Sequence, residues 1–205
     1  KQIFQMDKSY GADGMAVRAS IAKIADLKGK TVAASAPGTA PYFTLAWFLK
    51  KNGLTVKDVT VVNMEPASAA QAFIAGQNDV AMTYEPYLST VRAKPDAGKI
   101  LVTSKDYPVV IDVLVFKTDF IQQHPKVVKA TVDSFFEALD MIKREPAKAH
   151  ELMGSVVKQP GDAFAKSAAF ITWQDRAANK AYFAKEHQEF VDFAIRVLKS
   201  NRVIQ

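Results

Sequence analysis

The chain has 205 residues, 49% of them hydrophobic, so it can bury one large core or two modest ones. The formal net charge is +6, but the lysines are scattered and no basic run alternates with aromatic residues. This pattern argues against a nucleic-acid groove and favours a positive field that attracts small anions. Cysteine is absent, which excludes disulfides, thiol catalysis and thiolate metal sites. No apolar run is long enough to span a bilayer and no signal-peptide pattern opens the chain, so we expect any targeting segment to be removed already.

The first half of the chain alternates between strand and helix patterns. Two β-prone runs, 3–6 and 15–18, flank the sequence DKSYGADG, whose glycines and aspartates indicate a turn. Beyond them, β-prone runs alternate with helical periodicity that ends at glycines. We expect strands at 31–34, 59–62 and 80–83, and helices at 41–52 and 67–75. Such alternation predicts a parallel sheet that is covered by helices on both faces.

The second half of the chain becomes helical. A helix from Tyr87 to about residue 93 precedes strands at 100–103 and 111–116. From Thr118 to Val203 the pattern is helical, with helices at 118–124 and 126–143 and breaks near residues 154 and 160. The composition changes between residues 107 and 119, where we expect a hinge.

The sequence Gly38-Thr39-Ala40-Pro41 stands at the start of the first long predicted helix. Proline suits a first helical turn because its missing N–H would be unpaired there, and Thr39 or a neighbour is expected to cap the helix. The remaining N–H groups and the helix dipole suit a carboxylate, sulfonate, phosphate or nitro group. An ordinary N-cap with water explains the same residues, and the Lys-Ser or Lys-Thr of a P-loop is missing.

The DKSYGADG segment supplies Asp7, Ser9 and Asp13 within a few residues. These short polar side chains either line a cleft or merely reverse the chain. They lack the spacing of an EF-hand calcium site, and we expect no metal there.

Tyr84 and Glu85 follow a predicted strand, at the end where open α/β sheets bind ligands. We expect Tyr84 to stack on a ligand and Glu85 to accept hydrogen bonds or to pair with a cation. In the alternative interpretation, Pro86 starts the next helix and Glu85 caps it electrostatically.

Asp112 lies between apolar residues of a β-prone run, so it is expected to face a cleft or to pair with a cation, because unpaired burial is costly. Trp47 and the Phe135-Phe136 pair fall on apolar helical stripes and are predicted to be core residues. Trp173 is ambiguous. Neither a catalytic triad nor a metal-binding HExxH motif is present. The histidines are expected at the surface: His124, His150 and His187.

Taken together, these segments resemble the periplasmic substrate-binding proteins of ABC importers, in the nitrate, sulfonate and taurine class. The similarity rests on DKSYGADGMAV, DLKGKTVA, GTAPYF, AFIAGQNDVAMTYEP and VVIDVLVFKTDFIQQHPKVVKATVDSFFEALDMI. The order of these segments matches throughout, and they span most of the chain. Where many members have Trp-Glu-Pro, this chain has Tyr84-Glu85-Pro86.

The resemblance implies an α/β fold of the type II periplasmic-binding-protein kind, with two lobes that close on a small polar or anionic ligand. Residues 21–108 would form one complete doubly wound lobe. Residues 1–20 and 109–205 would form hinge strands and a partial lobe rich in C-terminal helices, so the chain looks like an N-terminally truncated portion. The implied ligand residues are Ser9, Asp13, Gly38, Thr39, Ala40, Tyr42, Tyr84, Glu85 and Asp112.

The resemblance further implies a non-enzymatic protein without cofactor, which passes its ligand to a membrane permease and is a monomer when complete. It would be periplasmic, or lipid-anchored at the outer face of the cytoplasmic membrane. Two alternatives stay open: an enzyme like the pyrimidine-forming synthases of thiamine-precursor synthesis, or a sensory ligand-binding domain. The ligand itself is left open between an anion, a zwitterion such as an aminosulfonate, and a neutral heterocycle.

Overall fold

The computed structural model describes residues 1–200. Contacts divide the chain into two compact units. Unit 1 comprises residues 1–8 and 111–188, and unit 2 comprises residues 9–110 together with the described residues from Glu189 on. The chain therefore passes from one unit to the other after Lys8, after Val110 and after Gln188.

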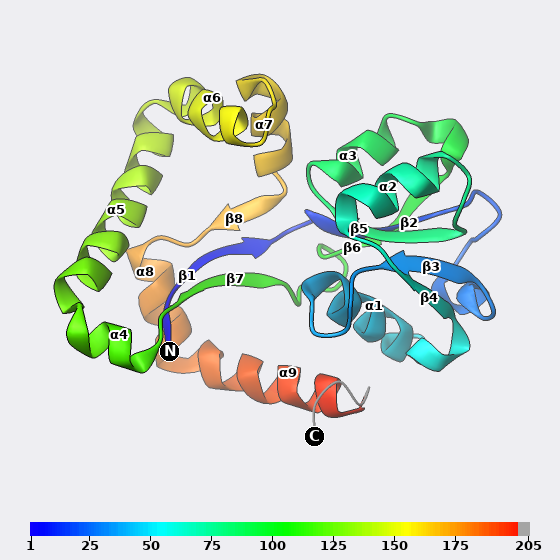
Figure 1. Ribbon diagram of the computed structural model, residues 1–205, viewed down its shortest axis with the longest axis horizontal. Helices are drawn as coiled ribbons and strands as arrows, with labels where there is room; N and C mark the ends of the chain where they lie inside the picture. The colour runs from blue at the N-terminus through cyan, green and yellow to red at the C-terminus, as the bar shows by residue number, and fades with distance from the viewer. Residues whose placement is uncertain (201–205) are drawn as a thin grey trace. The chain divides into compact units, whose positions relative to one another are not determined.

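Unit 2 is built on a five-stranded sheet with the order β4-β3-β5-β2-β6 (Figure 1). β3 pairs in parallel with β4 and β5, whereas β2 runs antiparallel to β5 and β6. The prediction of a parallel sheet is therefore wrong for β2, which follows β1 after a short bend and has no helical crossover before it. The strands are β2 (Asp13–Val17), β3 (Thr31–Ala34), β4 (Thr60–Asn63), β5 (Val80–Tyr84) and β6 (Lys99–Thr103).

Helices cover both faces of this sheet, as predicted, with α1 on one face and α2 and α3 on the other (Figure 1). Because strand side chains alternate between faces, each face has its own cluster. The cluster on the α1 side contains large side chains, among them Met15, Phe48 and Met82. The cluster on the other side contains alanines of the three central strands: Ala16, Ala33 and Ala81. The helices are α1 (Ala40–Lys51), α2 (Pro66–Ile74) and α3 (Tyr87–Arg92), with 3-10 turns at Ile24–Leu27, Val56–Asp58 and Pro95–Ala97.

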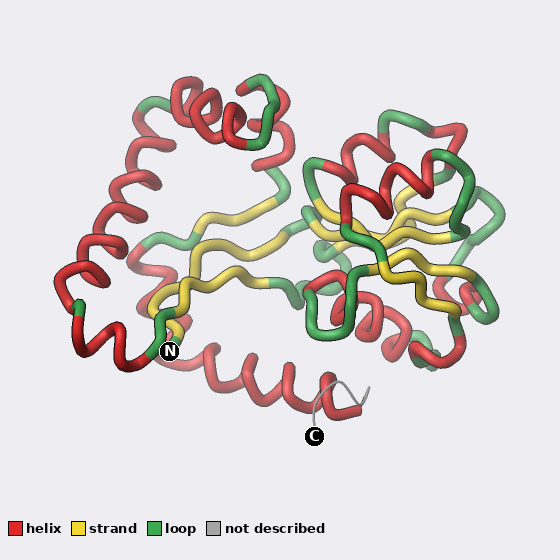
Figure 2. Tube along the Cα trace, in the orientation of Figure 1, coloured by secondary structure: helices red, strands yellow, loops and turns green. Residues whose placement is uncertain are grey.

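Unit 1 contains a three-stranded sheet with the order β7-β1-β8 (Figure 2). Phe4 of β1 packs against Phe135 and Phe136, with ring centroids 4.5 and 5.8 Å apart, which confirms that this aromatic pair belongs to the core. The strand β8 contradicts the helical prediction for its segment. A strand of three residues is too short to show an alternating pattern in the sequence, so it was not predicted. The strands are β1 (Gln2–Ser9), β7 (Ile111–Val115) and β8 (Ile171–Trp173).

Helices make up the rest of unit 1 and continue to the last described residue. None of the helices within residues 1–200 has the combined length and apolarity that crossing a membrane would need. The predicted helical pattern runs on to Val203, which lies outside the described residues. The helices are α4 (Thr118–Gln123), α5 (Pro125–Arg144), α6 (Pro146–Val156), α7 (Gly161–Ala168), α8 (Arg176–Ala181), a π-helical turn (Tyr182–Glu186) and α9 (His187–Ser200).

Two predicted boundaries need correction. β1 continues through Asp7 to Ser9, so only residues 10–12 of DKSYGADG bend. The predicted lobe began at residue 21, yet β2 lies inside the sheet between β5 and β6, and contacts place residues 9–20 in unit 2. Residues 189–200 also cluster with unit 2, far along the sequence from the rest of it.

Candidate ligand-binding site

The strand register brings the segments that carry most of the predicted ligand residues to one edge of the sheet of unit 2. Asp13 at the start of β2 pairs with Tyr84 at the end of β5, and Gly14 pairs with Thr103 at the end of β6. β3 is parallel to β5, so the loop between β3 and α1 leaves from the same edge. Open α/β sheets bind ligands at this carboxyl edge. All predicted ligand residues except Asp112 lie in unit 2, on segments at or next to this edge.

The N-terminus of α1 opens at this edge. Gly38 has a φ of 94°, a left-handed conformation that glycine adopts readily. Thr39 occupies the N-cap position, but its hydroxyl donates to the carbonyl of Ala36 at 2.8 Å and makes no cap bond. We predicted that Thr39 or a neighbour caps the helix: Thr39 does occupy the N-cap position, but its side chain does not supply the cap bond. Gly38 and Ala40 are exposed, and Thr39 and Tyr42 are half-buried.

A residue that sequence analysis missed lies just before this loop. Ser35 follows β3 directly and is 2% exposed, and its hydroxyl has no hydrogen-bond partner within residues 1–200. Buried hydroxyls nearly always have a partner, so an unpartnered one calls for a physical explanation. The signal was available in the sequence, because Ser35 is the first polar residue after a buried strand.

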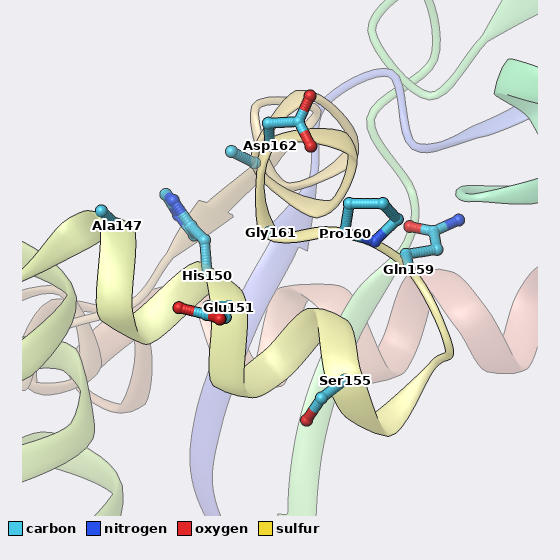
Figure 3. Close-up of a pocket in the computed structure, with 9 residues that line it drawn as sticks. Ala147, His150, Glu151, Ser155, Gln159, Pro160, Gly161 and Asp162 are labelled. Carbon is cyan, nitrogen blue, oxygen red and sulfur yellow. The ribbon is translucent and has the colours of Figure 1, made fainter.

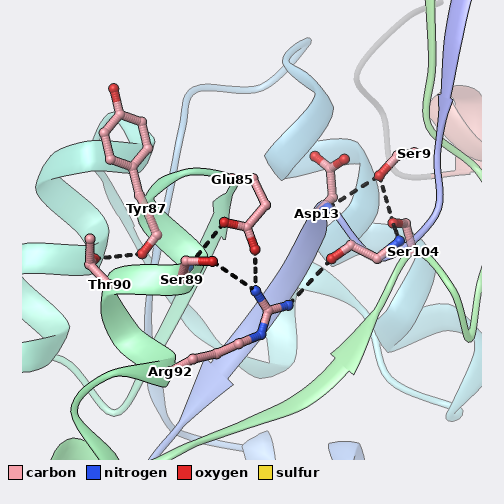
Figure 4. Close-up of polar contacts among 9 residues, drawn as sticks. Ser9, Asp13, Glu85, Tyr87, Ser89, Thr90, Arg92 and Ser104 are labelled. Carbon is pink, nitrogen blue, oxygen red and sulfur yellow. Dashed lines mark hydrogen bonds and ion pairs between the residues drawn. The ribbon is translucent and has the colours of Figure 1, made fainter. Parts of the chain in front are cut away.

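Ser9 and Asp13 belong to a hydrogen-bond network in the loop that enters β2 (Figure 4). The hydroxyls of Ser9 and Ser104 lie 2.6 Å apart. Backbone N–H groups donate to this pair, from Gly11 to Ser104 at 2.8 Å and from Asp13 to Ser9 at 3.2 Å. Ser9, Asp13 and Ser104 are all buried. The network fixes the loop, so the hydroxyl of Ser9 has a structural partner of its own.

Glu85 is held inside unit 2 by Arg92 and α3 (Figure 4). Its Oε1 is in contact with Nη1 of Arg92, and its Oε2 accepts the N–H of Ser89 at 3.1 Å. The guanidinium also donates to the carbonyl of Gly11 at 3.4 Å. The Glu85 side chain is 6% exposed. These contacts agree with the interpretation in which Glu85 stabilises the start of the next helix.

Two aromatic rings are accessible at the same edge. Tyr84 is 37% exposed, and Tyr10 is 52% exposed. The ammonium of Lys105, in the loop after β6, lies 5.3 Å from the ring centroid of Tyr10, which is the geometry of a cation–π contact. The edge therefore offers apolar ring surface together with positive charge.

Asp112 and the three histidines belong to unit 1. Asp112 is in unit 1 on the edge strand β7, opposite Asp7, and it is exposed. The argument that burial would force it to find a partner is wrong, because the side chain of Asp112 faces water, unlike those of its neighbours Ile111 and Val113, which are half-buried. His124, His150 and His187 all lie on the helical part of the chain, and within residues 1–200 no three His, Asp or Glu side chains are grouped to hold a metal.

A pocket in unit 1 lies between α6 and α7 (Figure 3). His150 and Glu151 of α6 line it, together with Gln159 from the loop before α7 and Asp162 in the first turn of α7. The two helices meet closely at Gly161, where a Cβ would lie 2.9 Å from the backbone of Glu151. None of the predicted ligand residues lines this pocket.

Residues 4–157 match the model of the NMT1-like family, which is most of the chain. The chain belongs to this family. Over 142 residues it is 32% identical to the taurine-binding periplasmic protein of Escherichia coli K12, covering 67% of this chain and 43% of that protein. The chain thus spans about half the length of the curated relatives that it matches.

Solved structures share the fold. The alkanesulfonate-binding protein SsuA from Xanthomonas axonopodis pv. citri, bound to MOPS, matches all of this chain and 70% of its own, with a TM-score of 0.75 and 19% identity. The desulfurization enzyme DSZB matches with a TM-score of 0.66 and 16% identity, over all of this chain and 73% of its own. The predicted α/β fold and the resemblance to sulfonate-class binding proteins are confirmed.

Proposed function

We propose that this protein is the solute-binding component of an ABC-type importer, which captures a small organic anion of the sulfonate type and delivers it to a membrane permease. The taurine-binding and alkanesulfonate-binding relatives support this class of function. The observation that carries the proposal is the buried hydroxyl of Ser35, which has no hydrogen-bond partner within residues 1–200 and precedes by four residues Thr39, the N-cap of α1, whose side chain makes no cap bond.

The chemistry of this edge suits a sulfonate. The first N–H groups of a helix lack intrahelical partners, and the helix dipole favours negative charge there. A buried hydroxyl without a partner costs about 1–3 kcal/mol, which a ligand oxygen accepting from Ser35 would recover. A sulfonate has three oxygens and can accept from the helix N-terminus and from the hydroxyl at once.

Isothermal titration calorimetry of the full-length protein with alkanesulfonates, taurine, nitrate and amino acids tests this function. We expect a sulfonate to bind, and Ser35→Ala to weaken that binding by at least about fivefold through the lost hydrogen bond. Ser20→Ala, at an exposed position in the loop after β2, is the matched control and should bind normally. Absence of sulfonate binding, or equal binding by both serine variants, would contradict the proposal.

The cellular setting follows from the same function. A periplasmic location is supported by the names of the relatives, and we propose it for this protein, either free or lipid-anchored. The partners would be the small-molecule ligand and the permease, with the complete protein acting as a monomer. Size-exclusion chromatography with light scattering of the full-length protein checks the last point.

We further propose that the protein does not transform its ligand. The taurine-binding relative is named as a binding protein, although DSZB shows that an enzyme also uses this fold. A metal-dependent reaction would need grouped ligands, and within residues 1–200 no three His, Asp or Glu side chains are grouped to hold a metal. Release of sulfite or sulfinate from a bound sulfonate, followed by chromatography, would contradict this proposal.

A further inference from the structure

The carboxylate that sequence analysis offered to a ligand amine is already engaged. Both oxygens of Glu85 have partners in unit 2, the guanidinium of Arg92 and the N–H of Ser89. The side chains of Glu85 and Arg92 are 6% and 29% exposed. In such a shielded pair, removing one partner leaves an uncompensated charge, so a ligand ammonium could displace Arg92 only at a large cost.

Other acidic residues at the edge are poorly suited to an ammonium. Asp13 is buried and already takes part in an interaction within residues 1–200, so it is not a free group for a ligand ammonium. Asp106 closes the turn after β6 by accepting from the N–H of Thr103 at 2.9 Å. Glu65, before α2, is exposed, and an ion pair with a ligand there would be solvated and weak.

The remaining groups at the edge favour an uncharged substituent. Lys105 places a positive charge beside Tyr10, so this part of the edge gives a second cation no attraction. The exposed rings of Tyr10 and Tyr84 offer surface to carbon groups. An apolar substituent gains from contact with these rings, whereas an ammonium loses water without gaining a carboxylate in return.

We propose that the binding edge of unit 2 selects sulfonates with an uncharged substituent over aminosulfonates such as taurine, because Arg92 neutralises Glu85. This selectivity rests on the proposed function and names its substrate class. It differs from the ligand named for the taurine-binding relative. Arg92 is then a specificity-determining residue that acts through Glu85 and does not itself touch the ligand.

Taurine and propane-1-sulfonate form a matched pair of probes, because a methyl group replaces the ammonium at equal length. We expect the full-length protein to bind propane-1-sulfonate at least about tenfold more tightly than taurine. Equal binding, or tighter binding of taurine, overturns the selectivity and leaves the sulfonate function standing. Failure of every sulfonate to bind overturns the proposed function and this inference with it.

Two variants test the role of the pair. Arg92→Gln should release the carboxylate and lower the ratio of the taurine to the propane-1-sulfonate dissociation constant by at least about threefold. Glu85→Gln should change both constants by the same factor, whereas a selective loss of taurine binding would show that Glu85 holds the ammonium.

Lys129→Gln, which removes an exposed ion pair of α5, is the control. Each variant is judged by a ratio within one preparation, so partial unfolding affects both ligands alike. An unchanged ratio in Arg92→Gln overturns the assignment of Arg92.

Discussion

Phe193 of α9 packs edge-on against the indole of Trp47 on α1, with ring centroids 4.6 Å apart and an interplanar angle of 89°. Both residues belong to unit 2. The ammonium of Lys51 lies 4.6 Å from the same indole, and Nζ of Lys50 donates to the hydroxyl of Ser200 at 3.1 Å. The C-terminal helix is thus attached to the helix whose N-terminus opens at the binding edge.

Phe193→Ala should detach this helix in part. We expect a loss of about 1–3 kcal/mol in the free energy of unfolding, and a red shift in Trp47 emission as water reaches the indole. The measurement uses a Trp173→Phe background, so that Trp47 alone reports. Ile195→Ala, at a position that is 39% exposed, is the control and should change neither quantity by much. An unshifted emission in Phe193→Ala would show that the contact does not form.

Gly98 should not tolerate a side chain. Its φ is 152°, and a Cβ there would lie 2.2 Å from the carbonyl oxygen of Val17 and 2.7 Å from the ring of Phe73. We expect Gly98→Ala to lower the free energy of unfolding by about 3 kcal/mol or more, as measured by urea denaturation. Gly76→Ala is the control, because Gly76 also has positive φ but faces open space, and it should cost about 1–2 kcal/mol. Equal losses would contradict the clash.

Arg18 stabilises the end of the unit 2 sheet that lies away from the binding edge. Its guanidinium donates to three backbone carbonyls, at 2.6 to 2.7 Å, and lies 4.1 Å from the ring centroid of Phe73. Lysine has no planar fork, so Arg18→Lys should lose part of this contact and about 2 kcal/mol in urea denaturation. Arg144→Lys, at an exposed position on α5, should be neutral. If Arg18→Lys left the free energy of unfolding unchanged, one hydrogen-bond donor at this position would be enough to hold the three carbonyls.

Tyr182 should make stability depend on alkaline pH. Burial, and secondarily the charge of Glu186, raises the pKa of its hydroxyl above the ordinary 10.0. The unfolded chain then loses this proton first, so the stability that the group contributes is present below pH 10.0 and is lost as pH rises through the folded pKa. Tyr182→Phe should therefore lose less stability above pH 10.0 than the parent does.

The same variant has a second expected result at neutral pH. The hydroxyl of Tyr182 is buried and has no hydrogen-bond partner within the described residues, so its removal should leave stability unchanged or slightly raised. Tyr10→Phe, at a ring that is 52% exposed, is the control for both measurements. Strong destabilisation near neutral pH would reveal a partner, such as buried water.

Most helices and strands of unit 2 could be predicted from the sequence because their periods are long or their ends are marked. α1 has apolar residues at helical spacing and Gly53 just beyond its end, and it lies one residue from the predicted range. β3 lies where it was expected, since its apolar run is short and flanked by polar residues. The direction of β2 relative to its neighbours was not predictable in the same way, because the alternation of side chains along a strand is the same for parallel and antiparallel pairing.

The contacts at the binding edge depended on information that local patterns lack. Glu85 meets Arg92 seven residues later only because α3 turns the guanidinium back toward the strand end. The hydroxyls of Ser9 and Ser104 form a hydrogen bond although the two residues are 95 positions apart in the sequence. Asp112 was misread because its run looks buried, and only the sheet order reveals an edge strand.

The alanines at the centre of the sheet have a consequence for redesign. Ala16, Ala33 and Ala81 let the α2 layer approach the strands so closely that an added methylene there has nowhere to go. The cluster on the α1 side, which contains the flexible side chains of Met15 on β2 and Met82 on β5, has more ways to repack. A library of variants aimed at new ligands should therefore vary the loops and α1 and leave the three alanines unchanged.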